Sequence, residues 1–216
     1  MKLPIAATLL YVPSQTDVDA QIVELTDPLI EQRMGSPWWN DPALDSTLAA
    51  REIDRYWNWK ELEIERPENT AFRDIGRYRK LSARKLAIIT EDGAVQGAMM
   101  VSTEPVKCER EPDVALFVEL LFAAPRNRQW IRRDRAEQFR GIGLGLLRTA
   151  AQLSVEAGFG GCLKLESSPD FVDWYKKRGF LEVSRALIVH DGIKYTPMEL
   201  PADRVAILLP ERKKGK

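Results

Sequence analysis

The glycine-rich stretch Arg140-Gly141-Ile142-Gly143-Leu144-Gly145 is the most informative part of this sequence. It lies between an apolar, strand-like run at 115–124 and an amphipathic run at 144–157 whose apolar residues recur with helical spacing. Glycines between a strand and a helix let the backbone approach a ligand closely, and the unpaired N–H groups of the helix point at that ligand. The stretch therefore predicts a loop that binds a phosphate or pyrophosphate group.

Two common nucleotide-binding loops fit this spacing poorly. A P-loop requires Lys followed by Ser or Thr after its last glycine, whereas Leu146 and Leu147 follow here. The Rossmann fingerprint requires three glycines at other offsets, although Glu166 does end the next apolar run. Dinucleotide binding is therefore kept as a minor alternative. The pattern that remains is Arg-x-x-Gly-x-Gly.

This hexapeptide and its surroundings resemble motif A of the GNAT superfamily, the acyl-CoA-dependent N-acyltransferases, whose pattern is Gln/Arg-x-x-Gly-x-Gly/Ala. The flanking segments match in order. Val118–Pro125 resembles the family's fourth strand, which carries an acidic residue, and Gly160–Ser168 resembles the fifth strand. The Tyr-x-x-x-Gly-Phe sequence at 175–180 resembles the end of the following short helix, and 86–101 resembles the hairpin of the second and third strands. The resemblance covers about residues 85–200.

The resemblance implies an α/β fold with a mixed, mostly antiparallel, twisted central sheet flanked by helices. We expect a single GNAT-like domain over residues 1–216. Within it, 1–84 supplies an N-terminal strand and helices that cover the acceptor side, and 85–200 supplies the hairpin and the acyl-CoA-binding core. Residues 201–216 form a C-terminal tail.

The remaining elements are predicted from periodicity and turn residues. A strand is expected at 17–25, a helix at 44–65 and a shorter helix at 71–85. Strands at 181–189 and 193–200 are joined by a hairpin turn at Asp191-Gly192, next to His190, the only histidine. Four tryptophans are expected either in the core, which is commoner at helical spacing, or in an acceptor pocket: Trp38, Trp39, Trp57 and Trp59.

Two side chains carry the chemistry that the resemblance implies. Acyl transfer from a thioester to an amine needs a base for the amine proton and an acid for the departing thiolate. Glu119 lies within an apolar strand and matches the acidic residue that several family members use as a base, directly or through water. Tyr175 matches the tyrosine that the family places near the CoA sulfur. The alternatives are a salt-bridged Glu119 and a Tyr175 that packs a helix onto the sheet.

Acetyl-CoA is the co-substrate that the resemblance implies. Backbone groups at the end of the fourth strand would pair with pantetheine, and the glycine loop would hold the pyrophosphate through its N–H groups. Ser168 would close the far wall together with Tyr175. The predicted cofactor-binding residues are Leu121, Phe122, Ala123, Ala124, Arg140, Gly141, Ile142, Gly143, Leu144, Gly145, Leu146 and Ser168.

One departure from the family is an arginine-rich insertion at 126–137, where the family usually has a few residues. Its five arginines suggest either contacts with the CoA 3′-phosphate or an acidic substrate, or a solvated loop, which is the commoner outcome for such a charge run.

Composition is compatible with a globular enzyme. Lys plus Arg and Asp plus Glu number 32 each, so no global field favours nucleic acid or an anionic membrane. Cys108 and Cys162 have neither metal-ligand nor disulfide spacing, which favours a reducing, cytoplasmic setting and no metal. The apolar run at 3–12 lacks a clear signal-peptide cleavage site, and no run is long enough to cross a bilayer.

Together these observations predict an N-acetyltransferase that moves an acetyl group from acetyl-CoA to a primary amine. The alternatives are a transferase for longer acyl-CoA and a non-catalytic acyl-CoA-binding sensor or interaction module. The acceptor is open, and a homodimer is expected only by resemblance to the family.

Overall fold

A computed structural model describes residues 3–34, 36–50, 52, 58–67, 78–109, 114–183, 188–190 and 193–209. The chain forms two compact units that alternate along the sequence. The first unit comprises Val101–Glu119 and Leu147–Lys216, and the second comprises Lys2–Met100 and Leu120–Leu146. Three elements contribute residues to both units: β6 (Val95–Lys107), β7 (Val114–Ala123) and α4 (Ile142–Glu156).

The strands of the first unit surround the parallel pair β7 and β9. Leu116 lies opposite Leu163, and Val118 lies opposite Leu165. The neighbouring pairs β9–β12 and β10–β12 are antiparallel. In order, the hydrogen-bonded strands are β10 (Leu181–Glu182), β12 (Ile193–Leu200), β9 (Leu163–Ser167), β7 and β6, and β11 (Ile188–His190) pairs with β12.

Glycine and proline residues lie at the ends of the helical segments of the first unit. Gly158, with φ of +85°, ends α4, and the N–H of Phe159 donates to the carbonyl of Ser154 at 2.8 Å. The predicted short helix consists of the 3-10 turn η5 (Pro169–Phe171) and α5 (Val172–Lys176). The segment predicted as a tail instead begins with η6 (Ala202–Arg204) and α6 (Val205–Leu208).

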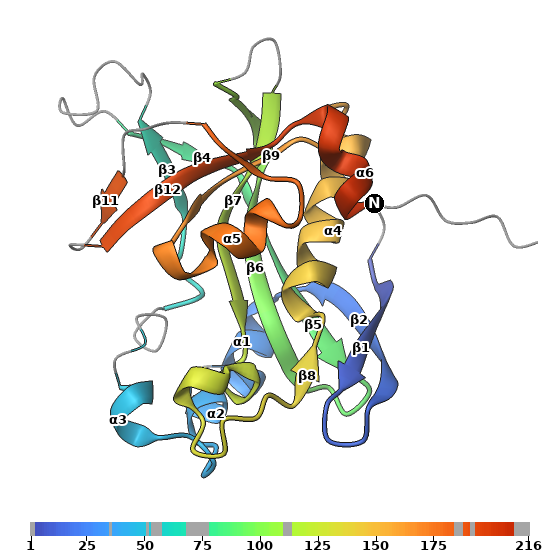
Figure 1. The fold of residues 1–216 in the computed structure, drawn as a ribbon, viewed down its shortest axis with the longest axis vertical. Helices are drawn as coiled ribbons and strands as arrows, with labels where there is room; N and C mark the ends of the chain where they lie inside the picture. Colours follow the sequence, from blue (N-terminus) through green and yellow to red (C-terminus); the bar gives the residue numbers. More distant parts are fainter. Residues whose placement is uncertain are drawn as a thin grey trace, which may run out of the picture. The chain divides into compact units, whose positions relative to one another are not determined.

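Helix α6 lies beside the part of α4 that belongs to the first unit (Figure 1). Arg148 Nε donates to the carbonyl of Leu208 at 2.9 Å, and the Leu208 side chain is fully buried. Val155, one of the apolar residues of the amphipathic run at 144–157, is 43 % exposed. The buried face of α4 is completed by Ser154, whose hydroxyl donates to the carbonyl of Cys162 at 2.8 Å.

The strands of the second unit begin with the hairpin of β1 (Ile5–Tyr11) and β2 (Thr16–Glu24), which is clear in Figure 1. The strand expected at 17–25 is confirmed as β2, whereas the apolar run at 3–12 contains β1, a strand that we did not predict. The neighbouring strands follow the order β7, β6, β5 (Ala83–Thr90), β2, β1 and β8 (Phe139–Arg140). A separate pair consists of β3 (Ile64–Pro67) and β4 (Tyr78–Leu81).

Two predicted helices of the N-terminal region are wrong where the structure describes them. Only Ser46–Ala49 (α3) of the range 44–65 is helical, since Asn58–Leu62 forms turns and Ile64–Pro67 is a strand. The range 71–85 contains β4 and the start of β5 in its described part. Other helical segments in the described part of this unit are α1 (Asp27–Arg33), α2 (Ser36–Trp39), the first turn of α4 and the 3-10 turns η3 (Pro125–Asn127) and η4 (Gln129–Ile131).

Tryptophan side chains form much of the core of the second unit. Trp38 and Trp59 are buried, with their rings edge to face at 6.1 Å, and Trp59 meets Phe122 in the same way at 6.4 Å. Trp38 Nε1 donates to the carbonyl of Val95 at 3.2 Å. These two residues are therefore core residues and do not line an acceptor pocket. Trp57 lies outside the described residues.

The predicted fold class is confirmed, because the sheet is mixed, mostly antiparallel and flanked by helices. The hairpin expected at 86–101 corresponds to β5 and β6, whose turn places Gly93 at φ of +73°. Division of the chain at residues 84 and 200 stays a prediction. The boundaries of the two compact units fall elsewhere.

Candidate functional site

The glycine loop leads directly into helix α4, the longest helix described. Gly141 has φ of +93°, a left-handed conformation that costs little only in glycine. The first bond of the helix joins the N–H of Gly145 to the carbonyl of Gly141 at 2.8 Å. The preceding N–H groups have no acceptor within the helix, and they lie at its positive end. Gly141 and Arg140 are exposed, so this end of α4 is accessible from solvent.

The first turn of α4 packs closely against β6 at Gly97, which has no side chain. A methyl group at Gly97 would lie 2.4 Å from Ile142 Cγ2 and 2.7 Å from the carbonyl oxygen of Phe122. Both distances are shorter than any ordinary contact, so only glycine lets β6, β7 and the loop approach this closely. A single glycine inside an otherwise apolar strand is the sequence signal that could have identified this position.

The end of β7 is already partly engaged by the chain itself. Leu121, Phe122 and Ala123 are half-buried, and the carbonyl of Ala123 accepts a hydrogen bond from Arg128 Nε at 2.8 Å. Ala124 is fully buried, its N–H donates to the carbonyl of Gln96 at 2.7 Å, and its carbonyl accepts from the N–H of Asn127 at 2.8 Å. We therefore do not retain Ala124 among the proposed ligand contacts.

The arginine-rich insertion, which belongs to the second unit, is a solvated loop only in part: Gln129, Trp130 and residues 133–136 are exposed, whereas Arg128 and Arg132 are buried. Arg128 is 1 % exposed and Arg132 is 6 % exposed. Arg128 Nη1 lies 2.8 Å from Glu52 Oε2, and its guanidinium stands over the rings of Trp39 and Phe122. Both arginines are thus paired with groups of the chain.

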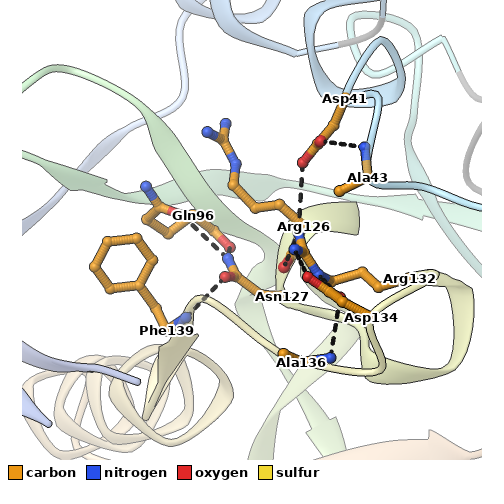
Figure 2. Close-up of polar contacts among 9 residues, drawn as sticks. All are labelled: Asp41, Ala43, Gln96, Arg126, Asn127, Arg132, Asp134, Ala136 and Phe139. Atoms are coloured by element: carbon orange, nitrogen blue, oxygen red, sulfur yellow. Dashed lines mark hydrogen bonds and ion pairs between the residues drawn. The ribbon is translucent and has the colours of Figure 1, made fainter. Parts of the chain in front are cut away.

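Arg132 closes the outer turn of this insertion (Figure 2). It donates two hydrogen bonds to Asp134, at 2.8 and 2.5 Å, and lies 3.5 Å from Asp41 Oδ2. Hydrogen bonds from the Arg132 side chain and from the N–H of Ala136 lower the pKa of Asp134 to about 2, with a smaller contribution from the charge of Arg132. A buried arginine with these partners has little freedom to bind an added phosphate.

Glu119 and Ser168 belong to the first unit. Glu119, on β7, is half-buried and follows the buried Val118. Ser168 precedes η5, and its carbonyl accepts from the N–H of Phe171 at 3.1 Å and from the hydroxyl of Ser167 at 2.9 Å. Its own side chain makes no capping bond to that turn.

Tyr175 lies on α5 between two aromatic rings. Its ring centroid is 4.9 Å from that of Trp174 and 5.4 Å from that of Phe180, both edge to face. Desolvation raises the pKa of the phenol well above its ordinary value, and the nearby Arg178 opposes this shift only in part. Tyr175 is therefore a protonated donor at neutral pH, which is the state that a general acid requires.

The other candidate groups carry little chemistry. Cys108 and Cys162 form no disulfide, and both are buried and packed around Ala115. Among the described residues, no group of three or more His, Cys, Asp or Glu side chains is placed to hold a metal ion. None of the helices in the described ranges is both long and apolar enough to cross a membrane.

The structure thus brings together one predicted set of residues within the second unit. Phe122 and Ile142 meet around Gly97, and Arg140–Leu146 form the loop and the start of α4. Glu119, Ser168 and Tyr175 belong to the first unit. The positions that we did not predict are Gly97, Gln96, Asn127 and Arg128.

A protein-family model matches the part of the chain that begins just before the glycine loop. Residues 134–202 match the family described as "Acetyltransferase (GNAT) domain". The protein carries a GNAT domain. The matched segment contains the glycine loop, α4, β9 and α5, so the GNAT resemblance of the sequence is confirmed. No curated protein matches the sequence.

Solved structures resemble the GNAT protein only distantly. A nourseothricin acetyltransferase is 21 % identical, with 65 % of this chain and 84 % of that chain covered and a TM-score of 0.39. A bacterial toxin is 15 % identical, with 62 % and 75 % covered and a TM-score of 0.45. An acyl-CoA N-acyltransferase from Pseudomonas aeruginosa is 16 % identical, with 54 % and 67 % covered and a TM-score of 0.39. Likenesses at this level say nothing about the substrate.

Proposed function

We propose that this GNAT protein is an N-acetyltransferase that moves the acetyl group of acetyl-CoA to a primary amine. The observation that carries the proposal is the loop Arg140–Gly145, in which the exposed, left-handed Gly141 directly precedes a 15-residue helix. Backbone donors at the positive end of a helix suit a pyrophosphate, which needs no particular side chain. The loop that would hold the pyrophosphate lies entirely within the second unit.

The reaction needs two proton transfers, and we assign them to residues of the first unit. The amine nitrogen attacks the thioester carbonyl carbon, an N–C bond forms and the C–S bond breaks. Glu119 accepts the proton lost by the amine, directly or through water. Tyr175 gives its proton to the departing thiolate. Unchanged turnover in both Glu119→Gln and Tyr175→Phe would contradict these roles.

Isothermal titration with acetyl-CoA, CoA and NAD tests the binding step. Gly143→Asp adds a negative side chain to the loop and should abolish acetyl-CoA binding while the protein stays folded. Gly158→Asp is the matched control, because Gly158 is exposed, lies at the other end of α4 and has space for a side chain, with no heavy atom within 4 Å of where a methyl group would lie. Binding of NAD without binding of acetyl-CoA would overturn the proposal.

Two alternatives make different predictions in the same material. A transferase for longer acyl chains should turn over those donors faster than acetyl-CoA on a panel of amines. A sensor should bind acetyl-CoA and show no turnover with any amine. We favour catalysis because Tyr175, a residue type that can donate a proton, lies on α5 within the GNAT-matched segment.

The cellular setting and assembly are further parts of the proposal. We propose a cytoplasmic enzyme, because the two cysteines are buried and form no disulfide. We also propose a homodimer, on family resemblance alone. Light scattering on the purified protein distinguishes a dimer from a monomer of 24.6 kDa.

A further inference from the structure

We propose that the insertion at 126–137 holds the two cofactor-binding stretches of the second unit in register, with Asn127 as the positioning residue. This inference rests on the proposed function, because the two stretches are the end of β7 and the start of the glycine loop. Asn127 does not need to touch acetyl-CoA itself. Its role is to fix the backbone that does.

Asn127 is 6 % exposed and its side-chain amide is bonded at both ends (Figure 2). Its Oδ1 accepts from the N–H of Phe139 at 3.0 Å, directly before Arg140 and the glycines. Its Nδ2 donates to the backbone carbonyl of Gln96 at 3.2 Å and to Gln96 Oε1 at 3.1 Å. The start of the loop is therefore tied to strand β6 through one buried side chain.

Gln96 extends this connection to the turn of the β5–β6 hairpin. Its Nε2 donates to Thr90 Oγ1 at 3.0 Å, and the Thr90 hydroxyl donates to Asp92 Oδ1 at 2.7 Å. Both Gln96 and Thr90 are buried. Hydrogen bonds from Thr90 and from the N–H of Ala94 hold the pKa of Asp92 below its usual range. A buried polar chain in which each member has a partner fixes a single geometry.

The next residue, Arg128, ties down the other stretch. Its Nε donates to the carbonyl of Ala123 at the end of β7, and its Nη1 pairs with Glu52. Consecutive residues of the insertion therefore hold the loop and the strand end, with Gln96 bonded to both Ala124 and Asn127. Because the two stretches would bind different parts of one ligand, a small change in their spacing should weaken binding.

The test compares Asn127→Leu with Asp134→Asn. Leu has a similar size and removes every side-chain hydrogen bond of Asn127. Asp134→Asn breaks an ion pair of the same insertion but leaves Arg132 beside Asp41. Hydrogen exchange of the ligand-free protein is the first measurement. Amides at 139–146 should exchange about tenfold faster in Asn127→Leu and at the wild-type rate in Asp134→Asn.

Titration with acetyl-CoA is the second measurement. Asn127→Leu should raise Kd, and KM for the donor, about tenfold with kcat changed less than about twofold, whereas Asp134→Asn should change neither. Gln96→Met should weaken binding in the wild-type background and add little in the Asn127→Leu background, because both act through one chain. A purely structural defect would lower the active fraction and leave Kd and KM unchanged.

Unchanged exchange at 139–146 in a folded Asn127→Leu protein would overturn the inference, as would a wild-type Kd. If Asn127→Leu does not fold, the same two readouts on Gln96→Met decide the matter. A wild-type protein that does not bind acetyl-CoA would refute the proposed function instead, and the exchange experiment would still decide whether Asn127 holds the loop.

Discussion

The surroundings of Tyr175 change the pKa of its side chain. The phenol lies between Trp174 and Phe180, and desolvation raises its pKa. The shift stabilises the neutral form, so the proton stays on the oxygen in the pH range where free tyrosine would begin to ionise, near 10. The raised pKa also makes this phenol a weaker acid than free tyrosine, so proton transfer to a departing thiolate is harder from it than from free tyrosine.

Tyr175→Phe should lower kcat roughly 10²-fold and leave the Kd for acetyl-CoA nearly unchanged, because it removes a proton donor and retains the ring. The wild-type pH profile of kcat should show no decline caused by this phenol below pH of about 10. Steady-state kinetics over pH 6 to 10 measures both. A loss of affinity without a loss of kcat would place the hydroxyl in binding and not in proton transfer.

Gly97 is a residue at which the absence of a side chain has consequences in the second unit. Gly97→Ala should destabilise the protein by about 2 kcal/mol or more, because the new methyl group would overlap Ile142 and the carbonyl of Phe122. Gly158→Ala, which meets no atom within 4 Å but has φ of +85°, should cost only about 1 kcal/mol. Urea unfolding at pH 7 measures the difference. Equal losses for the two variants would mean that the close approach at Gly97 is unimportant.

At the scale of elements, the insertion is held in place by ion pairs as well as by the amide chain, the hydrogen-bonded series Asp92, Thr90, Gln96, Asn127 and Phe139. The pKa of Asp134 is about 2 beside Arg132. A depressed carboxyl pKa adds stability above the unfolded-state value of about 4, and this contribution is lost as pH falls towards about 2. Wild type should therefore be more stable than Asp134→Asn at pH 7, and the two should converge near pH 2. Thermal unfolding of both proteins between pH 7 and pH 2 measures this difference in stability. A difference that persists near pH 2 would contradict the assignment.

The elements that could be predicted are those whose signals are local. The strand–glycine–helix order around 140 depends on neighbouring residues, and this prediction agrees with the structure. In its described part, the helix expected at 44–65 is interrupted by turns at Asn58–Leu62, and its predicted end at Ile64 and Glu65 is a strand that pairs with Tyr78–Leu81. Pairing with a distant partner overrides helical spacing.

The candidate site was predictable to the same extent. The loop residues follow from the sequence pattern, but the burial of Arg128 depends on Glu52, which lies 76 residues away in the sequence. No local pattern separates that arginine from the exposed ones of the insertion. The amide chain from Asp92 to Phe139 was likewise invisible, since its members come from separate elements.

At the scale of the whole molecule, binding should appear as a gain in stability. Acetyl-CoA at 100 times its Kd should add about 2.7 kcal/mol, which corresponds to a rise in Tm of roughly 5 to 10 °C for a chain of this size. NAD should leave Tm unchanged, and so should acetyl-CoA added to Gly143→Asp. A thermal shift assay with these three combinations checks the prediction, and a rise with NAD would indicate a general nucleotide effect.

From residue 2 onward, the chain passes from one compact unit to the other three times, within β6, β7 and α4. Neither unit is therefore encoded as one uninterrupted stretch. A stop codon or a protease cut after Glu119 removes part of both, and so does one after Ala123. Truncation should consequently yield fragments without a complete core and never a smaller working protein, so that shortened forms are expected to be cleared by proteolysis in the cell.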